Sequence, residues 1–132
     1  MDVKTLKNEY VVANPEGKAQ ILKSDDFWRI AFDKGNPANH PKMGYLMSQF
    51  SFEKDWDTWE RHPNGDEIVF CTSGHITLVL DSDKGHESIE LEQGQYIVVP
   101  QNTWHTAKVK KLASAVFLTW GFGTETRNID QT

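Results

Sequence analysis

The most constraining feature of this chain is a regular succession of short strand-like segments separated by turn signals, running from Gly44 to Trp120. The turns contain Asn-Gly, Ser-Gly or Glu-Gln-Gly sequences, whose residues readily adopt the backbone conformations of tight turns. The expected strands span residues 44–52, 58–61, 67–72, 76–80, 88–91, 95–99, 104–109 and 113–120. No segment shows a convincing helical apolar period over three turns. The pattern predicts an all-β sandwich or barrel.

The N-terminal part is less regular. Residues 1–18 are polar and contain the turn sequence Asn14–Gly17, whereas Gln20–Lys23 and Phe27–Phe32 are short strand-like runs and residues 34–41 form a loop. We expect residues 1–132 to form a single domain. We also predict a homodimer in which residues 1–18 pack on the partner, because such segments often cover a sheet edge. Apolar side chains available for that contact are Phe27, Trp28 and Ile30.

Composition excludes several classes of function. The 132 residues carry a formal net charge of −5, which argues against nucleic-acid binding because that function usually needs a basic face. The single cysteine, Cys71, cannot form an intrachain disulfide. No segment approaches the roughly 20 apolar residues that cross a membrane, and the first residues lack the apolar stretch of a secretory signal. We therefore expect no membrane partner and a cytoplasmic location.

Two of the five histidines lie where a metal site could form. Glu60 and His62 are two residues apart on one expected strand, so their side chains can share a face. Glu67 opens the next strand across a Pro-Asn-Gly-Asp turn, and His105 opens a later strand. Imidazole and carboxylate groups are ligands for Zn, Fe, Mn, Ni or Cu. Spacing alone leaves open that each histidine is an ordinary core or surface residue.

Residues 60–105 resemble the two conserved motifs of the cupin superfamily. The first motif contains His-x-His, a Glu and a later Gly, and the matching positions here are Glu60, His62, Glu67 and Gly74. The second contains Gly, Pro-x-Gly and His, and the matching positions are Gly94, Pro100, Asn102 and His105. The motifs thus span about residues 60–74 and 94–105. Three positions depart from the pattern: Glu60 replaces the first His, Lys54 the leading Gly, and Val109 the final Asn.

The resemblance implies a double-stranded β-helix, or jelly-roll barrel, with a metal inside. Carried over by position, the metal ligands are Glu60, His62, Glu67 and His105. The cofactor is then a divalent metal such as Mn, Fe, Zn or Ni, and a carboxylate in place of the first His makes Mn or Fe(II) more plausible. It also allows that the site has lost its metal.

Three functions remain open at this stage. The first is a metal-dependent enzyme acting on a small oxygenated organic molecule by dioxygenase, isomerase or lyase chemistry. The second is a small-molecule or sugar-binding barrel without turnover. The third is a metal-free epimerase-like or isomerase-like protein that uses His62 or His105 with Tyr96 as its base. Trp59, Trp104 and Trp120 either wall the pocket or simply pack in the core, and Cys71 either lines the cavity or is a small buried residue.

Overall fold

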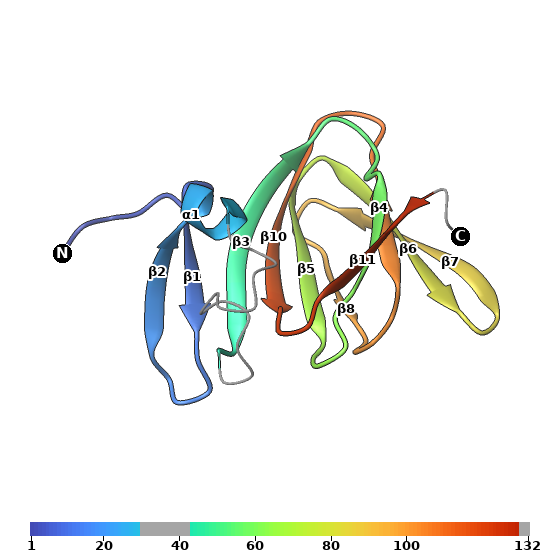
Figure 1. The fold of residues 1–132 in the computed structure, drawn as a ribbon. Coiled ribbons are helices and arrows are strands. Elements are labelled where there is room, and N and C mark those ends of the chain that lie inside the picture. The colour runs from blue at the N-terminus through green and yellow to red at the C-terminus, as the bar shows by residue number, and fades with distance from the viewer. Residues whose placement is uncertain (30–42, 130–132) are drawn as a thin grey trace.

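The structure is a computed structural model that describes residues 1–29 and 43–129 (Figure 1). Its first elements are β1 (Glu9–Ala13), β2 (Ala19–Lys23), α1 (Ser24–Arg29), β3 (Tyr45–Phe52), β4 (Thr58–Arg61) and β5 (Glu67–Ser73). The remaining strands are β6 (His75–Ser82), β7 (Gly85–Glu92), β8 (Tyr96–Val99), β9 (His105–Lys108), β10 (Ala113–Trp120) and β11 (Glu125–Asn128). No described helix is long and apolar enough to cross a membrane.

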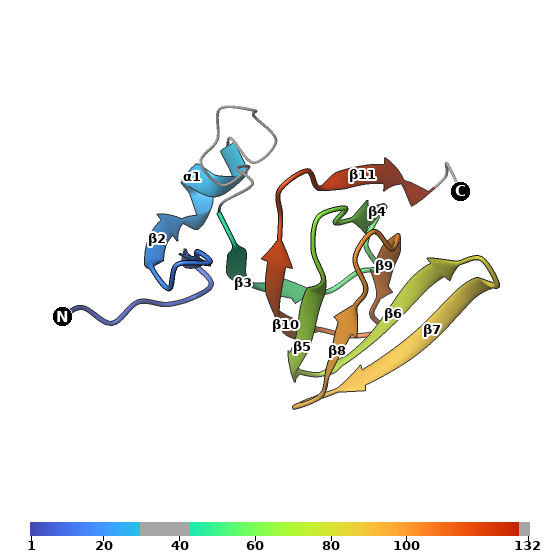
Figure 2. The same ribbon diagram turned by 90° about the horizontal axis from the view of Figure 1, so that it is seen from below.

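The strands form two antiparallel sheets that face each other, as Figure 2 shows. One sheet has the strand order β2-β1-β3-β10-β5-β8, and the other has the order β11-β4-β9-β6-β7. Apart from the hairpins β1-β2 and β6-β7, neighbouring strands are not consecutive in the sequence, as in a jelly roll. The predicted all-β jelly-roll fold is therefore confirmed.

Alternation along the strands determines which side chains enter the barrel. In β5, Glu67, Val69 and Cys71 are all buried, while the residues between them are only partly buried. On β3 the inward residues include Ser48 and Phe50. Cys71 belongs to the main hydrophobic core, with its thiol against the carbonyl oxygens of the next turn. It therefore behaves as a small buried residue and not as a cavity residue.

The N-terminal part departs from expectation in two ways. Residues within the polar segment 1–18 form strand β1, which pairs with β2 and β3 of the same chain. The expected strand Phe27–Phe32 is wrong, because Ser24–Arg29 form the helix α1. Two aspartates in its first turn stabilise the helix N-terminus, a local signal that outweighed the apolar pattern. The side chain of Trp28, together with Ile30 and the rest of the run, lies outside the described residues.

Hydrogen bonds join the turn after β4 to the turn before β9. The backbone amide of Asn102 donates to the carbonyl oxygen of His62 at 2.9 Å, and the amide of Gln101 donates to Asp66 Oδ1 at 2.7 Å. Asn102 stands where the resembled motif has a glycine and adopts a φ of 63°, which asparagine tolerates better than most residues. These contacts hold the ends of the two motifs at a fixed separation.

The outer face of the six-stranded sheet carries an uninterrupted apolar row. Cross-strand pairing aligns one outward residue from each strand: Ile21, Val11, Met47, Leu118, Ile68 and Val98. The row crosses five strand spacings, or about 24 Å. None of its members carries a charge, and the edge residues Ile21 and Val98 are well exposed.

Candidate metal site

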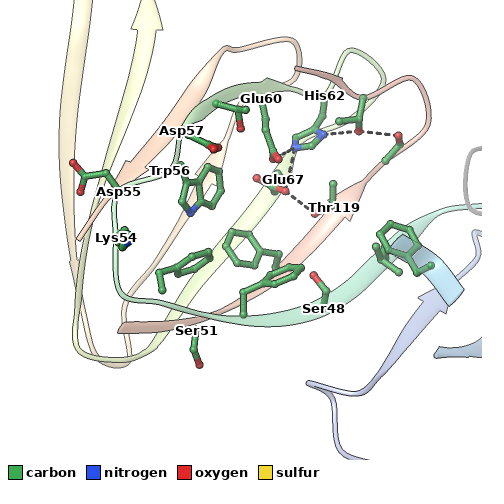
Figure 3. Close-up of a pocket in the computed structure, with 18 of the residues that line it drawn as sticks. Ser48, Ser51, Lys54, Asp55, Trp56, Asp57, Glu60, His62, Glu67 and Thr119 are labelled. Carbon is green, nitrogen blue, oxygen red and sulfur yellow. Dashed lines mark hydrogen bonds and ion pairs between the residues drawn. The ribbon is translucent and has the colours of Figure 1, made fainter. Parts of the chain in front are cut away.

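Four side chains predicted from the sequence converge between the two sheets, and Figure 3 shows three of them, Glu60, His62 and Glu67. Glu60 on β4 is the direct cross-strand partner of His105 on β9, so their side chains point the same way. His62 follows β4 and faces the same space, and Glu67 enters from β5 in the opposite sheet. His62, Glu67 and His105 are almost inaccessible to solvent, while Glu60 is partly exposed to the cavity.

Short distances connect the four side chains through the two imidazoles. Glu67 contacts both imidazoles, with Oε2 3.1 Å from His62 Nε2 and Oε1 3.0 Å from His105 Nε2. Glu60 Oε2 lies 3.9 Å from His62 Nε2. One ligand atom each from Glu60, His62 and His105 lies within 4.8 Å of the others, a His/Glu cluster that could bind a metal.

Hydrogen bonds on the far side of each imidazole determine which nitrogen carries the proton in the neutral ring. His105 Nδ1 lies 3.0 Å from the carbonyl oxygen of Thr103, which can only accept, so Nδ1 must donate. Thr124 Oγ1 donates its one hydrogen to the carbonyl oxygen of Gly121 and lies 2.9 Å from His62 Nδ1. His62 Nδ1 must therefore be the donor there as well. In both neutral rings the lone pair is on Nε2 and faces the cluster.

This arrangement leaves electron pairs facing one another. Among the described residues, His62 Nε2, His105 Nε2 and Glu67 Oε1 are buried and have no hydrogen bond of acceptable geometry, despite separations near 3 Å. Two ligand atoms about 2.1 Å from one ion and at right angles to each other are about 3.0 Å apart. The buried, unpartnered atoms therefore fit a shared cation, and each imidazole has the outer hydrogen bond typical of metal-binding histidines.

The electrostatics of the metal-free cluster follow from the same contacts. Burial raises the pKa of Glu67, but the adjacent imidazoles of His62 and His105 outweigh burial and hold that pKa well below its usual value. Burial lowers the pKa of His105, and the Glu67 carboxylate more than compensates, so the pKa of His105 is raised overall. Burial and the nearby Glu67 carboxylate raise the pKa of Glu60, against a smaller opposing effect of the imidazoles. A positive charge is therefore favoured at the centre of the cluster.

Several residues of the site were not predicted from the sequence. Thr119 on β10 donates a hydrogen bond to Glu67 Oε2, and Thr124 holds His62. Alternation from Phe117 could have placed Thr119 inside, but nothing local marks Thr124, which precedes the unpredicted strand β11. Trp56, in the loop before β4, lines the cavity and contacts the His105 ring at 6.4 Å between centroids.

Other sequence-based candidates lie elsewhere. Trp59, Trp104 and Trp120 are not among the described residues lining this cavity. Trp104 stacks between the guanidinium groups of Arg61 and Arg127, an arrangement that fixes β11 against β4. Tyr96 is 64% exposed on the outer face of the sheet, so its suggested pairing with His62 or His105 is wrong.

Comparisons with known proteins bear on the family and the fold. The sequence profile of the family described as "Cupin domain" matches residues 51–121. An acireductone dioxygenase of Exiguobacterium sibiricum is 43% identical over 47 residues, which cover 35% of this chain and 26% of that protein. The match therefore spans only about a quarter of the length of that relative.

Two solved structures illustrate the similarity of fold. A hydroquinone 1,2-dioxygenase from Sphingomonas sp. TTNP3 superposes with a TM-score of 0.51 and 17% identity, over 58% of this chain and 59% of that one. A hydroxypropylphosphonic acid epoxidase from S. wedmorenis gives a TM-score of 0.51 and 14% identity, over 58% and 44% of the chains. At these identities the likeness concerns the fold.

Proposed function

Because the chain belongs to the cupin family, we propose that it is a metal-dependent enzyme acting on a small oxygenated organic molecule. One observation carries this proposal. The Nε2 atoms of His62 and His105 and an oxygen of Glu67 converge in a buried space without hydrogen bonds among the described residues. Unpaired buried polar atoms are costly, so such a cluster favours a cation as its occupant.

The proposed ligands are Glu60, His62, Glu67 and His105. Two carboxylates and two imidazoles suit Mn, Fe(II), Zn or Ni, and the additional carboxylate at Glu60 favours the harder ions Mn and Fe(II). A cation in this position supplies Lewis-acid polarisation of substrate oxygen atoms and, if it is Fe(II), redox chemistry with O₂.

The protein's own groups would orient and shield the reaction. Thr124 and the Thr103 carbonyl hold the two imidazoles with Nε2 toward the cavity, and Thr119 holds Glu67. Glu60 is the proposed ligand most open to the cavity. The aromatic residues beside the cluster would keep water from the reacting atoms.

Among the possible reactions, we propose dioxygenase-type chemistry. The support is the local identity with an acireductone dioxygenase, a protein whose name states that activity. A non-catalytic binding barrel is the main alternative, because its cavity would look the same. A metal-free epimerase finds less support, since the His–Tyr96 pair on which it would depend is not formed.

Metal analysis of protein purified without an affinity tag tests the proposal. We expect about one divalent ion per chain, and its loss in His62→Ala and His105→Ala with the circular dichroism spectrum unchanged. His75→Ala is the matched control, because that imidazole lies outside the cluster on β6. Full metal content in both site variants would refute the ligand assignment.

Oxygen uptake then separates enzyme from binding protein. Pools of small oxygenated compounds should support O₂ consumption by the Fe(II)-loaded protein, and a chelator should abolish it. A ligand that stays bound and unchanged after the metal has been stripped would instead support the non-catalytic alternative.

We further propose a homodimer formed through the outer face of the six-stranded sheet. An apolar row without charged members crosses all six strands, and apolar patches of several hundred Å² on a folded protein usually mark an interaction surface. Two negatively charged copies can pack there because the contact itself brings no like charges together. The segment 1–18 contributes Val11 to this row, which supports the proposal that this segment packs on the partner.

A further inference from the structure

The cavity that opens beside the candidate ligands has a volume of about 810 Å³, and its described lining changes character with distance from them. The His/Glu cluster occupies one part of the wall. Apolar and aromatic side chains form the next part: Phe27, Met43, Leu46, Phe50, Phe52, Trp56 and Phe117. Four exposed residues of the loop between β3 and β4 lie at the opening: Glu53, Lys54, Asp55 and Asp57.

The aromatic part of the wall is a connected set of rings. Phe117 contacts Phe50, Phe52 and Trp56 at centroid distances of 5.6, 6.0 and 5.9 Å. Phe52 and Trp56 are 5.5 Å apart, and Trp56 reaches the His105 ring at 6.4 Å. The wall therefore extends from the phenylalanines to a proposed metal ligand. In Figure 3 the Trp56 side chain lies on the cavity side of the loop, next to Glu60 and Glu67.

The position of this wall is fixed from both ends. The Trp56 amide donates to the carbonyl oxygen of Ala107 at 2.9 Å, and Asp55 Oδ1 accepts from the Val109 amide at 2.9 Å. These bonds attach the loop to the chain after His105, so the indole and the imidazole keep their relative positions. A ring bound near the ligands would meet a preformed surface.

The charge of the opening limits which ligands can enter. Among the exposed residues of the described lining, Glu53, Asp55 and Asp57 outnumber the one cation, Lys54. A ligand whose outer end carries a negative charge would be repelled by this rim, although solvent and salt weaken the effect.

We propose that the substrate class of this site is an aromatic ring that carries an oxygen-containing metal-binding group at one end and no negative charge at the other. This inference rests on the proposed metal-dependent function.

Hydroxamates provide matched probes, because benzohydroxamate and acetohydroxamate present the same chelating group on different bodies. We expect calorimetric titration of the zinc-loaded protein to give at least about tenfold tighter binding of benzohydroxamate, from the apolar area that the ring buries. A 4-carboxyl group on the ring should weaken binding relative to a 4-methyl group, and added salt should reduce the difference.

A pair of variants tests whether the aromatic wall causes the preference for benzohydroxamate. Phe52→Leu should reduce the preference for benzohydroxamate, and Phe70→Leu, on the outer face of β5, should leave it unchanged. Equal affinities for the two hydroxamates in wild-type protein with stoichiometric zinc would overturn the inference and leave the metal site intact. A preference unaffected by Phe52→Leu would overturn the assigned wall. Failure to bind zinc would overturn the proposed function, and this inference with it.

Discussion

His62 Nδ1 and Thr124 Oγ1 lie 2.9 Å apart across 62 residues of sequence, in a hydrogen bond that fixes the orientation of one proposed metal ligand. Because the threonine hydrogen is already donated to Gly121, the oxygen can only accept from the imidazole. The same ring therefore presents the Nε2 lone pair to the cluster.

Removing that acceptor should weaken metal binding without removing a ligand. Thr124→Val should lower zinc affinity by about 10- to 100-fold, the range usual for outer hydrogen-bond partners of metal-binding histidines. Thr124→Ser should restore most of the affinity, because it keeps the hydroxyl. Thr126→Val, at an exposed position of β11, is the control. Competition with a fluorescent zinc chelator measures the change, and equal affinities for Thr124→Val and wild type would exclude the orienting role.

The contributions of Glu67 and His105 to the stability of the metal-free protein should have their maximum between about pH 4.5 and 6.5, and the raised pKa of Glu60 adds a loss of stability as pH rises above 4.5. The pKa of Glu67 is lowered on folding, so its contribution is complete above the unfolded value of 4.5 and is lost as pH falls further. The pKa of His105 is raised, so its contribution is complete below 6.5 and is lost as pH rises through the raised value. Urea unfolding in the presence of a chelator should show this maximum. Glu67→Gln should flatten it on both sides, and an unchanged profile would contradict the assignment.

On the alkaline side, zinc affinity should rise with pH, whereas the stability of the metal-free protein should fall. A proton on either imidazole competes with the cation, and the raised pKa of His105 extends this competition toward neutral pH. Affinity should therefore rise as pH increases from 5.5 to 8. Metal content after dialysis at each pH is the measurement, and complete retention at the acid end would argue against histidine ligands.

Replacing the unusual carboxylate should alter the choice of metal. Glu60→His adds an imidazole beside His62 and His105, which should strengthen binding of Zn and Ni relative to Mn. Glu16→His, in an exposed turn far from the cluster in the sequence, controls for an added histidine. Parallel titrations with Zn and Mn test the shift, and an unchanged ratio of affinities would place residue 60 outside the coordination sphere.

The apolar row on the outer sheet face should determine the oligomeric state. Light scattering at micromolar concentration should give a dimer for the wild type and a monomer for Ile68→Lys/Val98→Lys, because facing copies would then oppose lysines in an apolar contact. Val3→Lys, at an exposed N-terminal position, should remain dimeric. A monomeric wild type would contradict the proposal.

The sequence was most informative where a local pattern determined the structure. The turn at Asn64-Gly65 and the alternation along β5 predicted that Glu67 faces His62, although the two residues meet across the space between the sheets and not in a hairpin, because β4 and β5 do not pair. The residue spacing of the cupin motifs identified His105 as a further candidate ligand. Asn102 stands where the motif has a glycine, and it adopts the positive φ expected at that position. These features depend on residues close together in the chain.

What the sequence did not predict depends on contacts between distant segments. Thr124 acquires its role only because β11 pairs with β4, and no nearby residue signals that pairing. The choice of Trp56 over Trp59 and Trp104 as the cavity tryptophan likewise depends on the path of the loop after β3. Helix α1 was missed because of a local signal and not a distant contact. Two acidic residues at its start favour a helix, and the prediction gave more weight to the apolar run that follows.

The bond between His62 and Thr124 also bears on the order in which the molecule forms. Closing a chain segment of 62 residues has an entropic cost that must be met before the contact stabilises anything. Glu67 and Thr119 are separated by 52 residues, so the hydrogen bond that holds Glu67 has a similar entropic cost. A nascent or partly refolded chain therefore lacks the oriented donor set, so we expect the proposed cation to bind after the barrel has closed rather than to nucleate it.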